Sequence, residues 1–295
     1  MNNFHTPVLL QEIIEHIDPS PGKKYIDATI GGGGHTEAIL EKGGLVLGID
    51  VDQDAHSYVQ ENFKFQISNF KLKVAKGNFR DIDKITRLNN FEKVAGIIFD
   101  LGVSSFQIDN PNRGFSFQKE GELDMRMDQD LQVKALDLIN GLTKSELYEL
   151  FTRLGEESFA RPISDMIVKV RTVNPIKTTT QLRELLAKTR NAWTPKEKAM
   201  ASKKVFQALR IAVNSELDNI KEALPKAIDL LENKGRLAII SFHSLEDRIV
   251  KENFILFEEK GLGKIVTKKP IEASEEEVSK NKRSRSAKLR VFIKL

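Results

Sequence analysis

The chain has 295 residues, 40% of them hydrophobic, which is enough to bury a substantial core without cross-links. It contains no cysteine, so disulfides, thiolate zinc sites and cysteine nucleophiles are excluded, and its five scattered histidines show no metal-ligand spacing. No apolar run approaches the roughly 18 residues that span a bilayer, and the first residues lack the basic region of a secretory signal. We therefore expect a cytoplasmic protein with neither a metal nor a membrane partner.

The net charge of +4 is unevenly distributed along the chain. Residues 261–295 hold ten Lys and Arg against four Glu, so this C-terminal segment carries +6 and the remainder −2. Clustered cations displace counterions from phosphate chains. The segment therefore favours a polyanionic partner.

The first third of the chain alternates helical and strand patterns. A helix is predicted with Thr6 as N-cap and Pro7 at its first position, because apolar residues then share one face as far as Ile17. Further along, the patterns predict strands over 25–30, 45–49, 70–75 and 94–101, and helices over 36–42 and 55–65. This alternation is typical of βαβ units in a doubly wound parallel sheet.

After Ser105 the pattern changes, and about ninety residues contain no convincing strand. Three capping boxes mark helix starts there, at Thr143, Thr178 and Thr194, which predicts an inserted all-helical domain. Strand patterns return over 235–242, 265–267 and 289–293, and the charged stretch 275–288 is predicted to be a solvated loop. The predicted division is a first part of the core over 1–107, a substrate-recognising insertion over 108–207, and the second part of the core over 208–295.

Four consecutive glycines, Gly31 to Gly34, follow the first predicted strand. They would weaken any helix or strand interior, so they predict a turn that needs positive φ or a close approach to the backbone. The dinucleotide fingerprint Gly-x-Gly-x-x-Gly and the phosphate-binding P-loop are both absent. Such a loop suits the amino-acid portion of S-adenosylmethionine, and a plain strand-to-helix turn is the alternative.

Two residues that follow the next strands indicate a nucleoside site. Asp50 comes directly after the apolar run 45–49, where a carboxylate can accept hydrogen bonds from both ribose hydroxyls. Asp52 and Asp54 are rival positions, and Asp54 is also a candidate cap of the following helix. Phe79 follows the third strand, where it either stacks on adenine or belongs to the core.

Asp100 ends the fourth predicted strand, so its carboxylate is expected at the same edge of the sheet, facing the methyl group of the donor. Transfer from a sulfonium to nitrogen disperses positive charge, and the protein chiefly supplies in-line positioning and exclusion of water. Asp100 is predicted to accept the N–H groups of an exocyclic base amine, which localises the nitrogen lone pair. A turn or helix-cap role is the alternative. The Asn/Asp-Pro-Pro-aromatic sequence of many base-amino methyltransferases is absent here.

Seven motifs span essentially the whole chain, at 5–10, 31–35, 100–105, 113–117, 123–128, 241–248 and 283–290. Together they resemble the bacterial 16S ribosomal RNA (cytosine-N4)-methyltransferases of the RsmH or MraW type, which modify a cytosine of the decoding centre. The resemblance implies a seven-stranded Rossmann-like methyltransferase core with a helical insertion, and a cytosine of the small ribosomal subunit as acceptor. It also implies contacts with S-adenosylmethionine at Gly33, Gly34, His35, Asp50, Phe79, Asp100 and Gln107.

A base in folded RNA must leave its stack before it is methylated, so a pocket should adjoin the donor. Segments 113–117 and 241–248 alternate aromatics with hydroxyls and cations and are predicted to form it; ordinary half-buried loops are the alternative. With Asp100, His243 is the second predicted catalytic residue, because it could orient the base or move a proton. RNA contacts are predicted at Arg113, Phe115, Arg126, Arg248, Arg283, Arg285, Lys288 and Arg290. For Arg126, pairing with Asp124 or Asp128 is the alternative.

Two other functions remain alternatives. One is a nicotinamide-dependent oxidoreductase, against which the incomplete glycine fingerprint counts. The other is a ribosome-binding module that keeps the fold without activity, against which the pair Asp50 and Asp100 counts. The sequence leaves open whether the substrate is naked RNA or an assembled subunit, and whether the protein is a monomer or a homodimer.

Overall fold

The computed structural model describes residues 7–295, and the chain divides into two compact units. The core unit comprises the residues up to 102 together with 217–295, and the helical unit comprises 103–216. The predicted boundaries after residues 107 and 207 fall inside two helices, α6 (Ser105–Asp109) and α11 (Pro195–Asn214). The structure divides the chain after residues 102 and 216 instead, outside both of these helices.

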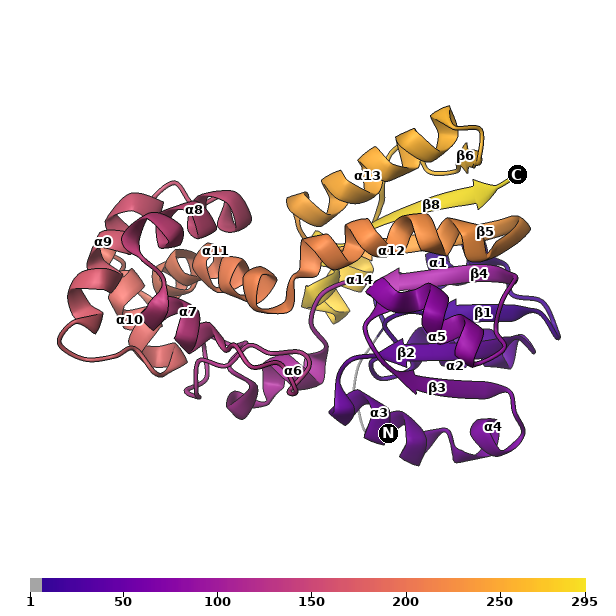
Figure 1. The fold of residues 1–295 in the computed structure, drawn as a ribbon, viewed down its shortest axis with the longest axis horizontal. Coiled ribbons are helices and arrows are strands. Elements are labelled where there is room, and N and C mark those ends of the chain that lie inside the picture. The colour runs from indigo at the N-terminus through magenta and orange to yellow at the C-terminus, as the bar shows by residue number, and fades with distance from the viewer. Residues whose placement is uncertain (1–6) are drawn as a thin grey trace. The chain divides into compact units, whose positions relative to one another are not determined.

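An eight-stranded sheet forms the centre of the core unit (Figure 1). Seven strands lie in the order β3-β2-β1-β4-β5-β8-β6, and the two-residue β7 pairs beside them with β8. The first five strands of this order are parallel, and β8 runs antiparallel to β5 and β6. The bounds are β1 Lys24–Asp27, β2 Leu45–Asp50, β3 Leu72–Lys76, β4 Val94–Asp100, β5 Leu231–Ser241, β6 Gly263–Ile265, β7 Ile271–Glu272 and β8 Lys288–Lys294. The predicted seven-stranded Rossmann-like core is confirmed, with β7 in addition.

Helices cover both faces of this sheet, as Figure 1 shows. Successive strand residues alternate between two apolar clusters, so that Ile97 and Phe99 pack on one side and Ile98 on the other. A strand buried on both faces reads as a continuous apolar run, which is why these strands were predictable. The first cluster includes α5 (Ile82–Leu88), α12 (Glu216–Leu230) and α13 (Ser244–Glu259), and the second includes α1 (Leu10–Ile17), α2 (Gly34–Glu41) and α3 (Gln53–Asn62).

The first helix starts later than predicted. Helix α1 begins at Leu10, because Leu9 adopts a left-handed conformation with φ of 52° that interrupts the helix before it. Pro7 is therefore not its first residue, and the predicted cap Thr6 lies outside the described residues. The cap of α3 is Asp52, whose side chain accepts from the N–H of Asp54, so the prediction of Asp54 as a candidate cap is wrong.

The charged stretch 275–288 is largely helical, which corrects the predicted loop. Helix α14 spans Glu275–Lys280 and a 3₁₀ turn spans Lys282–Ser286. Ser274 caps α14 by accepting from the N–H of Glu277, and acidic residues fill the first turn, where the helix dipole favours them. The short helix α4 (Lys64–Ser68) was not predicted either.

The helical unit confirms the three predicted capping boxes. The hydroxyls of Thr143, Thr178 and Thr194 accept from the backbone N–H three residues later, at the starts of α8, α10 and α11. Phe151, Leu186 and Phe206 are among the side chains of its apolar core. Its helices are α6, α7 (Ala135–Gly141), α8 (Lys144–Gly155), α9 (Ala160–Arg171), α10 (Thr179–Thr189) and α11. None of the helices described over 7–295 is both long and apolar enough to cross a membrane.

Candidate active site

Three aspartates lie at the carboxyl ends of three neighbouring strands of the core unit. Asp27 ends β1, Asp50 ends β2 and Asp100 ends β4. The order β2-β1-β4 brings these strand ends side by side at one edge of the sheet. In open parallel sheets this is the edge where ligands bind.

Side-chain hydrogen bonds hold the glycine loop at that edge. Asp50 Oδ2 accepts from the N–H of Gly31 at 2.9 Å, and Asp50 Oδ1 accepts from the N–H of Asp52 at 2.9 Å. The Thr29 hydroxyl accepts from the N–H of Asp100 at 2.7 Å. The glycine loop, Asp50 and Asp100 therefore converge as the sequence analysis predicted.

The protonation of Asp50 is shifted by its surroundings. Burial raises the pKa of Asp50 to about 6, against the two backbone N–H groups, which favour the carboxylate. This carboxyl group therefore changes charge at about pH 6, a higher pH than that at which an ordinary aspartate ionises.

The protein's own packing requires two of the glycines. Gly33 has φ of +79°, and a Cβ there would lie 2.8 Å from the ring of Phe63. A Cβ at Gly34 would lie 2.9 Å from the ring of Pro7. The groups that lie close to the backbone of Gly33 and Gly34 are thus side chains of the protein itself. The need for glycine at these two positions is explained without a ligand.

His35 lies between Asp100 and the first described residues of the chain. Its ring is buried, with Nε2 at 3.0 Å from the carbonyl oxygen of Val8 and Nδ1 at 3.9 Å from Asp100 Oδ2. Nε2 donates to this carbonyl, which leaves Nδ1 directed at the carboxylate. His35 thus holds a fixed position next to Asp100.

Asp27 is the residue of this edge that the sequence analysis did not select. Its side chain is almost completely buried, accepts from the Thr36 hydroxyl at 2.7 Å and also accepts from the N–H of Thr29. Burial raises the pKa of Asp27. The signal was present, because Asp27 also follows an apolar run, but the predicted strand extended to Ile30 and placed Asp27 inside it.

Two further predicted donor residues have structural contacts of their own. Phe79 is half-buried and packs edge-on against Phe99, with ring centroids 5.5 Å apart, so it belongs to the margin of the core. Gln107 belongs to the helical unit and completes a capping box at the start of α6. Its side chain accepts from the N–H of Ser104, and its own N–H donates to the Ser104 hydroxyl. Their contacts with a donor stay predictions.

His243 follows β5 and is the N-cap of α13. Its Nδ1 accepts from the N–H of Glu246 at 3.3 Å, and its Nε2 lies 3.2 Å from Glu246 Oε1. Glu246 Oε2 in turn accepts from the N–H of Phe242. Because Nδ1 is an acceptor, neutral His243 carries its proton on Nε2, beside a buried carboxylate. This arrangement supports a helix-capping role, and the predicted roles of His243 in orienting the base or moving a proton stay predictions.

The matches to known proteins extend over both units of the chain. The model of the MraW methylase family matches residues 2–295. The chain belongs to the MraW methylase family. It is 43% identical to a ribosomal RNA small subunit methyltransferase H from Carboxydothermus hydrogenoformans, over 100% of this chain and 99% of that protein. A protein of the same name from Heliobacterium mobile is 42% identical over 100% of both. A crystal structure of an rRNA methylase from Streptococcus thermophilus is 13% identical, with a TM-score of 0.43 over 97% and 93% of the two chains.

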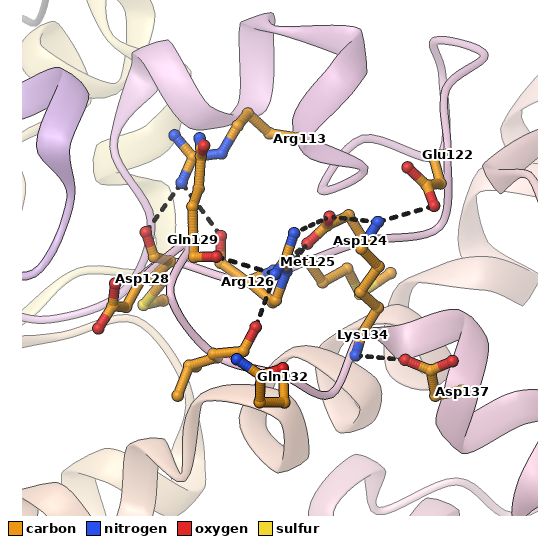
Figure 2. Close-up of polar contacts among 12 residues, drawn as sticks. Arg113, Glu122, Asp124, Met125, Arg126, Asp128, Gln129, Gln132, Lys134 and Asp137 are labelled. Atoms are coloured by element: carbon orange, nitrogen blue, oxygen red, sulfur yellow. Dashed lines mark hydrogen bonds and ion pairs between the residues drawn. The ribbon is translucent and has the colours of Figure 1, made fainter.

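In this methylase, two arginines predicted to contact RNA form hydrogen bonds within the helical unit (Figure 2). Arg126 forms a two-pronged pair with Asp124, with N–O distances of 2.8 Å, and donates to two backbone carbonyls from Nη1. Burial acts to raise the pKa of Asp124, but the bonded guanidinium outweighs it and lowers that pKa. Arg113 is 5% exposed and donates to the carbonyls of Arg126 and Met127. Phe115 is buried in the core beside them, so the geometry does not support RNA contacts by these three residues.

The basic residues near the C-terminal strand differ in how far they are buried. Buried Arg290 donates from Nε and Nη2 to the carboxylate of Asp247, at 2.6 and 3.1 Å, and Lys288 Nζ lies 3.9 Å from the same group. Arg290 is therefore a structural residue and not the predicted phosphate contact. Arg285 and, on α13, Arg248 are exposed, and Arg283 is half-buried.

This difference predicts unequal effects of two arginine substitutions on stability. Arg290→Met should lower the free energy of unfolding by about 2–3 kcal/mol, because Asp247 loses its buried partner. Arg285→Met, on an exposed turn, should change it by less than about 0.5 kcal/mol. Urea unfolding followed by circular dichroism measures both. Equal losses would show that Arg290 is not the structural member of the pair.

Proposed function

We propose that this methylase transfers a methyl group from S-adenosylmethionine to the exocyclic amine of a cytosine in 16S ribosomal RNA. Relatives that match it end to end are named ribosomal RNA small subunit methyltransferase H. The observation in the structure that carries the proposal is the convergence of the glycine loop, Asp50 and Asp100 at one edge of the sheet.

The groups at this edge suit the polar parts of the donor. S-adenosylmethionine, when bound, supplies an electrophilic methyl group on a sulfonium. The carboxylate of Asp50 would accept from its ribose hydroxyls, the backbone of the glycine loop would hold its amino-acid portion, and Phe79 would stack on its adenine. Further contacts are proposed, from the family resemblance, for Gly33, Gly34, His35 and Gln107.

Asp100 is the residue proposed to hold the acceptor. Its carboxylate would accept an N–H of the cytosine amine, which orients the nitrogen lone pair toward the methyl group. In the transfer a nitrogen–carbon bond forms, the sulfur–carbon bond breaks to leave S-adenosylhomocysteine, and the methylated amine releases one proton to water. His35, held by the carbonyl of Val8, lies beside this carboxylate, with Nδ1 at 3.9 Å from Asp100 Oδ2.

We further propose that the cytosine lies within the small ribosomal subunit and that the protein acts in the cytoplasm. The exposed cations Arg248 and Arg285 support an RNA partner. Membership of a methylase family counts against the oxidoreductase, and the retained pair Asp50 and Asp100 counts against an inactive module.

The test uses purified protein, isotope-labelled S-adenosylmethionine and 16S RNA, offered both as a naked transcript and within small subunits from cells that lack the gene. Nuclease digestion and mass spectrometry should find the label in N4-methylcytidine. Label on a ring carbon or on another base would contradict the amine assignment. Tight binding of S-adenosylhomocysteine without any transfer would favour the inactive module, and binding of NAD alone would favour the oxidoreductase.

A further inference from the structure

One face of α11 carries exposed apolar and cationic side chains in a row. Trp193 is 78% exposed and Met200 is 68% exposed, and Lys196 and Lys203 are exposed with them. Their spacing of three, four and three residues places them on one side of the helix, with Trp193 just before its start. These four residues are called the α11 stripe below.

The two lysines of the stripe are available to an external anion. Among residues 7–295, no carboxylate forms an ion pair with Lys196 or Lys203. The acidic groups near them are already bonded: Glu197 accepts from the N–H groups of Trp193 and Thr194, and Glu184 pairs with Lys198. The stripe therefore presents positive charge that the protein does not neutralise.

The charge of the surrounding segment has the same sign. Residues 153–216 hold thirteen Lys and Arg against six Asp and Glu, a net +7, which exceeds the +6 of residues 261–295. The first half of the helical unit, 103–152, holds five against nine, a net −4. The positive charge of the protein is thus not confined to its C-terminal segment, and within the helical unit it gathers in the half that contains the stripe.

Trp193 is held in place without being covered. Its backbone N–H donates to Glu197 Oε2 in the capping box, and the backbone N–H of the preceding, buried Ala192 donates to the carbonyl of Ala187. An apolar residue just before an N-cap often packs on the fourth residue of the helix, but here that residue is Lys198, which is paired with Glu184. The helix therefore does not use the indole ring, which is exposed on a backbone held by hydrogen bonds.

We infer that the α11 stripe binds a single-stranded segment of the RNA substrate, with Lys196 and Lys203 on phosphates and Trp193 stacked on a base. Proteins commonly hold single-stranded nucleic acid by combining cations that contact the backbone with an aromatic side chain on which a base stacks. Charge complementarity favours RNA over an apolar partner, because two of the four side chains are unpaired cations. The inference rests on the proposed function for the identity of the substrate, and it adds a binding surface in the helical unit.

Trp193 is the only tryptophan of the chain, so intrinsic tryptophan fluorescence reports on the stripe alone. Titration of the full chain with an unstructured uridylate oligomer of about twelve nucleotides should quench this fluorescence. In Lys196→Glu/Lys203→Glu, binding should weaken at least about tenfold, and the slope of log affinity against log salt should fall by roughly 1.4, or 0.7 for each lost phosphate contact. Trp193→Leu, measured by polarisation of labelled oligomer, should bind about tenfold more weakly.

Lys42→Glu/Lys64→Glu is the matched control, because it makes the same charge change at exposed lysines of the core unit. It should bind the oligomer within about twofold of the wild type, since both sites are outside the stripe. Equal weakening in the control and the stripe variant would overturn the inference. Quenching by phosphatidylglycerol vesicles but not by RNA would overturn it as well.

The failure of this inference can be told apart from failure of the proposed function. All variants should bind S-adenosylhomocysteine as the wild type does. If the wild type methylates 16S RNA and the stripe variants have an unchanged KM for it, the stripe is not a substrate surface and the proposed function stands. If no methyl is transferred but stripe-dependent quenching persists, RNA binding stands and the proposed function fails.

Discussion

Asp50→Asn should weaken the binding of S-adenosylhomocysteine by about a hundredfold while the protein remains folded. The carboxylate offers acceptors both to the ribose hydroxyls and to the N–H groups of Gly31 and Asp52, whereas an amide replaces one oxygen with a donor. Isothermal titration calorimetry measures the loss. Asp52→Asn is the matched control, because asparagine also caps helices and should leave both α3 and the affinity nearly unchanged.

The same residue predicts how donor binding depends on pH. The pKa of Asp50 is raised to about 6, and the form that accepts from both hydroxyls is the carboxylate. Binding should therefore be about tenfold tighter at about pH 7 than at about pH 5, and Asp50→Asn should remove the dependence. Without ligand, the free energy of unfolding depends on pH in the opposite direction. A raised carboxyl pKa contributes stability at low pH, and this contribution is lost as pH rises through about 6. Affinity that stays constant over this range would remove Asp50 from the ribose site.

Asp100→Asn should slow methyl transfer in a single turnover by about a hundredfold or more, with the affinity for S-adenosylhomocysteine changed by less than about fivefold. The amide would present a donor to the amine where the carboxylate presents only acceptors. Rapid-quench experiments on small subunits saturated with enzyme measure the rate.

The matched comparison for Asp100 is His243→Asn, because asparagine can keep the cap of α13. Its single-turnover rate should stay within about threefold of the wild type, since the ring of His243 is bonded to Glu246. If both variants were slowed equally, His243 would have a part in the chemistry after all. If Asp100→Asn lost affinity as much as rate, Asp100 would have only a binding role.

Most of the sheet could be predicted because its signals are local. Buried parallel strands are short apolar runs, and the acids that form the last residues of β2 and β4 mark where the runs end. The capping boxes of the helical unit identify helix starts within four residues of sequence. The start of α9 had no such signal, since Phe159 precedes it and makes no side-chain cap.

Whether a charged residue is buried and paired or exposed could not be predicted, because this depends on partners far along the chain. Arg290 and its partner Asp247 are separated by 43 positions, and only the pairing of β8 with β5 brings them together. Arg113 donates to carbonyls 13 and 14 residues away. The sequence shows that an arginine is present, but it does not show whether its guanidinium already pairs with an acid or donates to a carbonyl within the protein.

The core unit is interrupted by the whole helical unit, although β4 and β5 are neighbours in the sheet. Pairing of Asp100 with Ile240 must therefore close a very long loop, and the entropic cost of closure grows with the length of flexible chain enclosed. Helical bundles with local contacts form quickly, and a segment that has already folded shortens that flexible length. We therefore expect the helical unit to speed the folding of the core unit. Destabilising the helical unit would slow the pairing of β4 with β5, although it contributes no strand to the sheet.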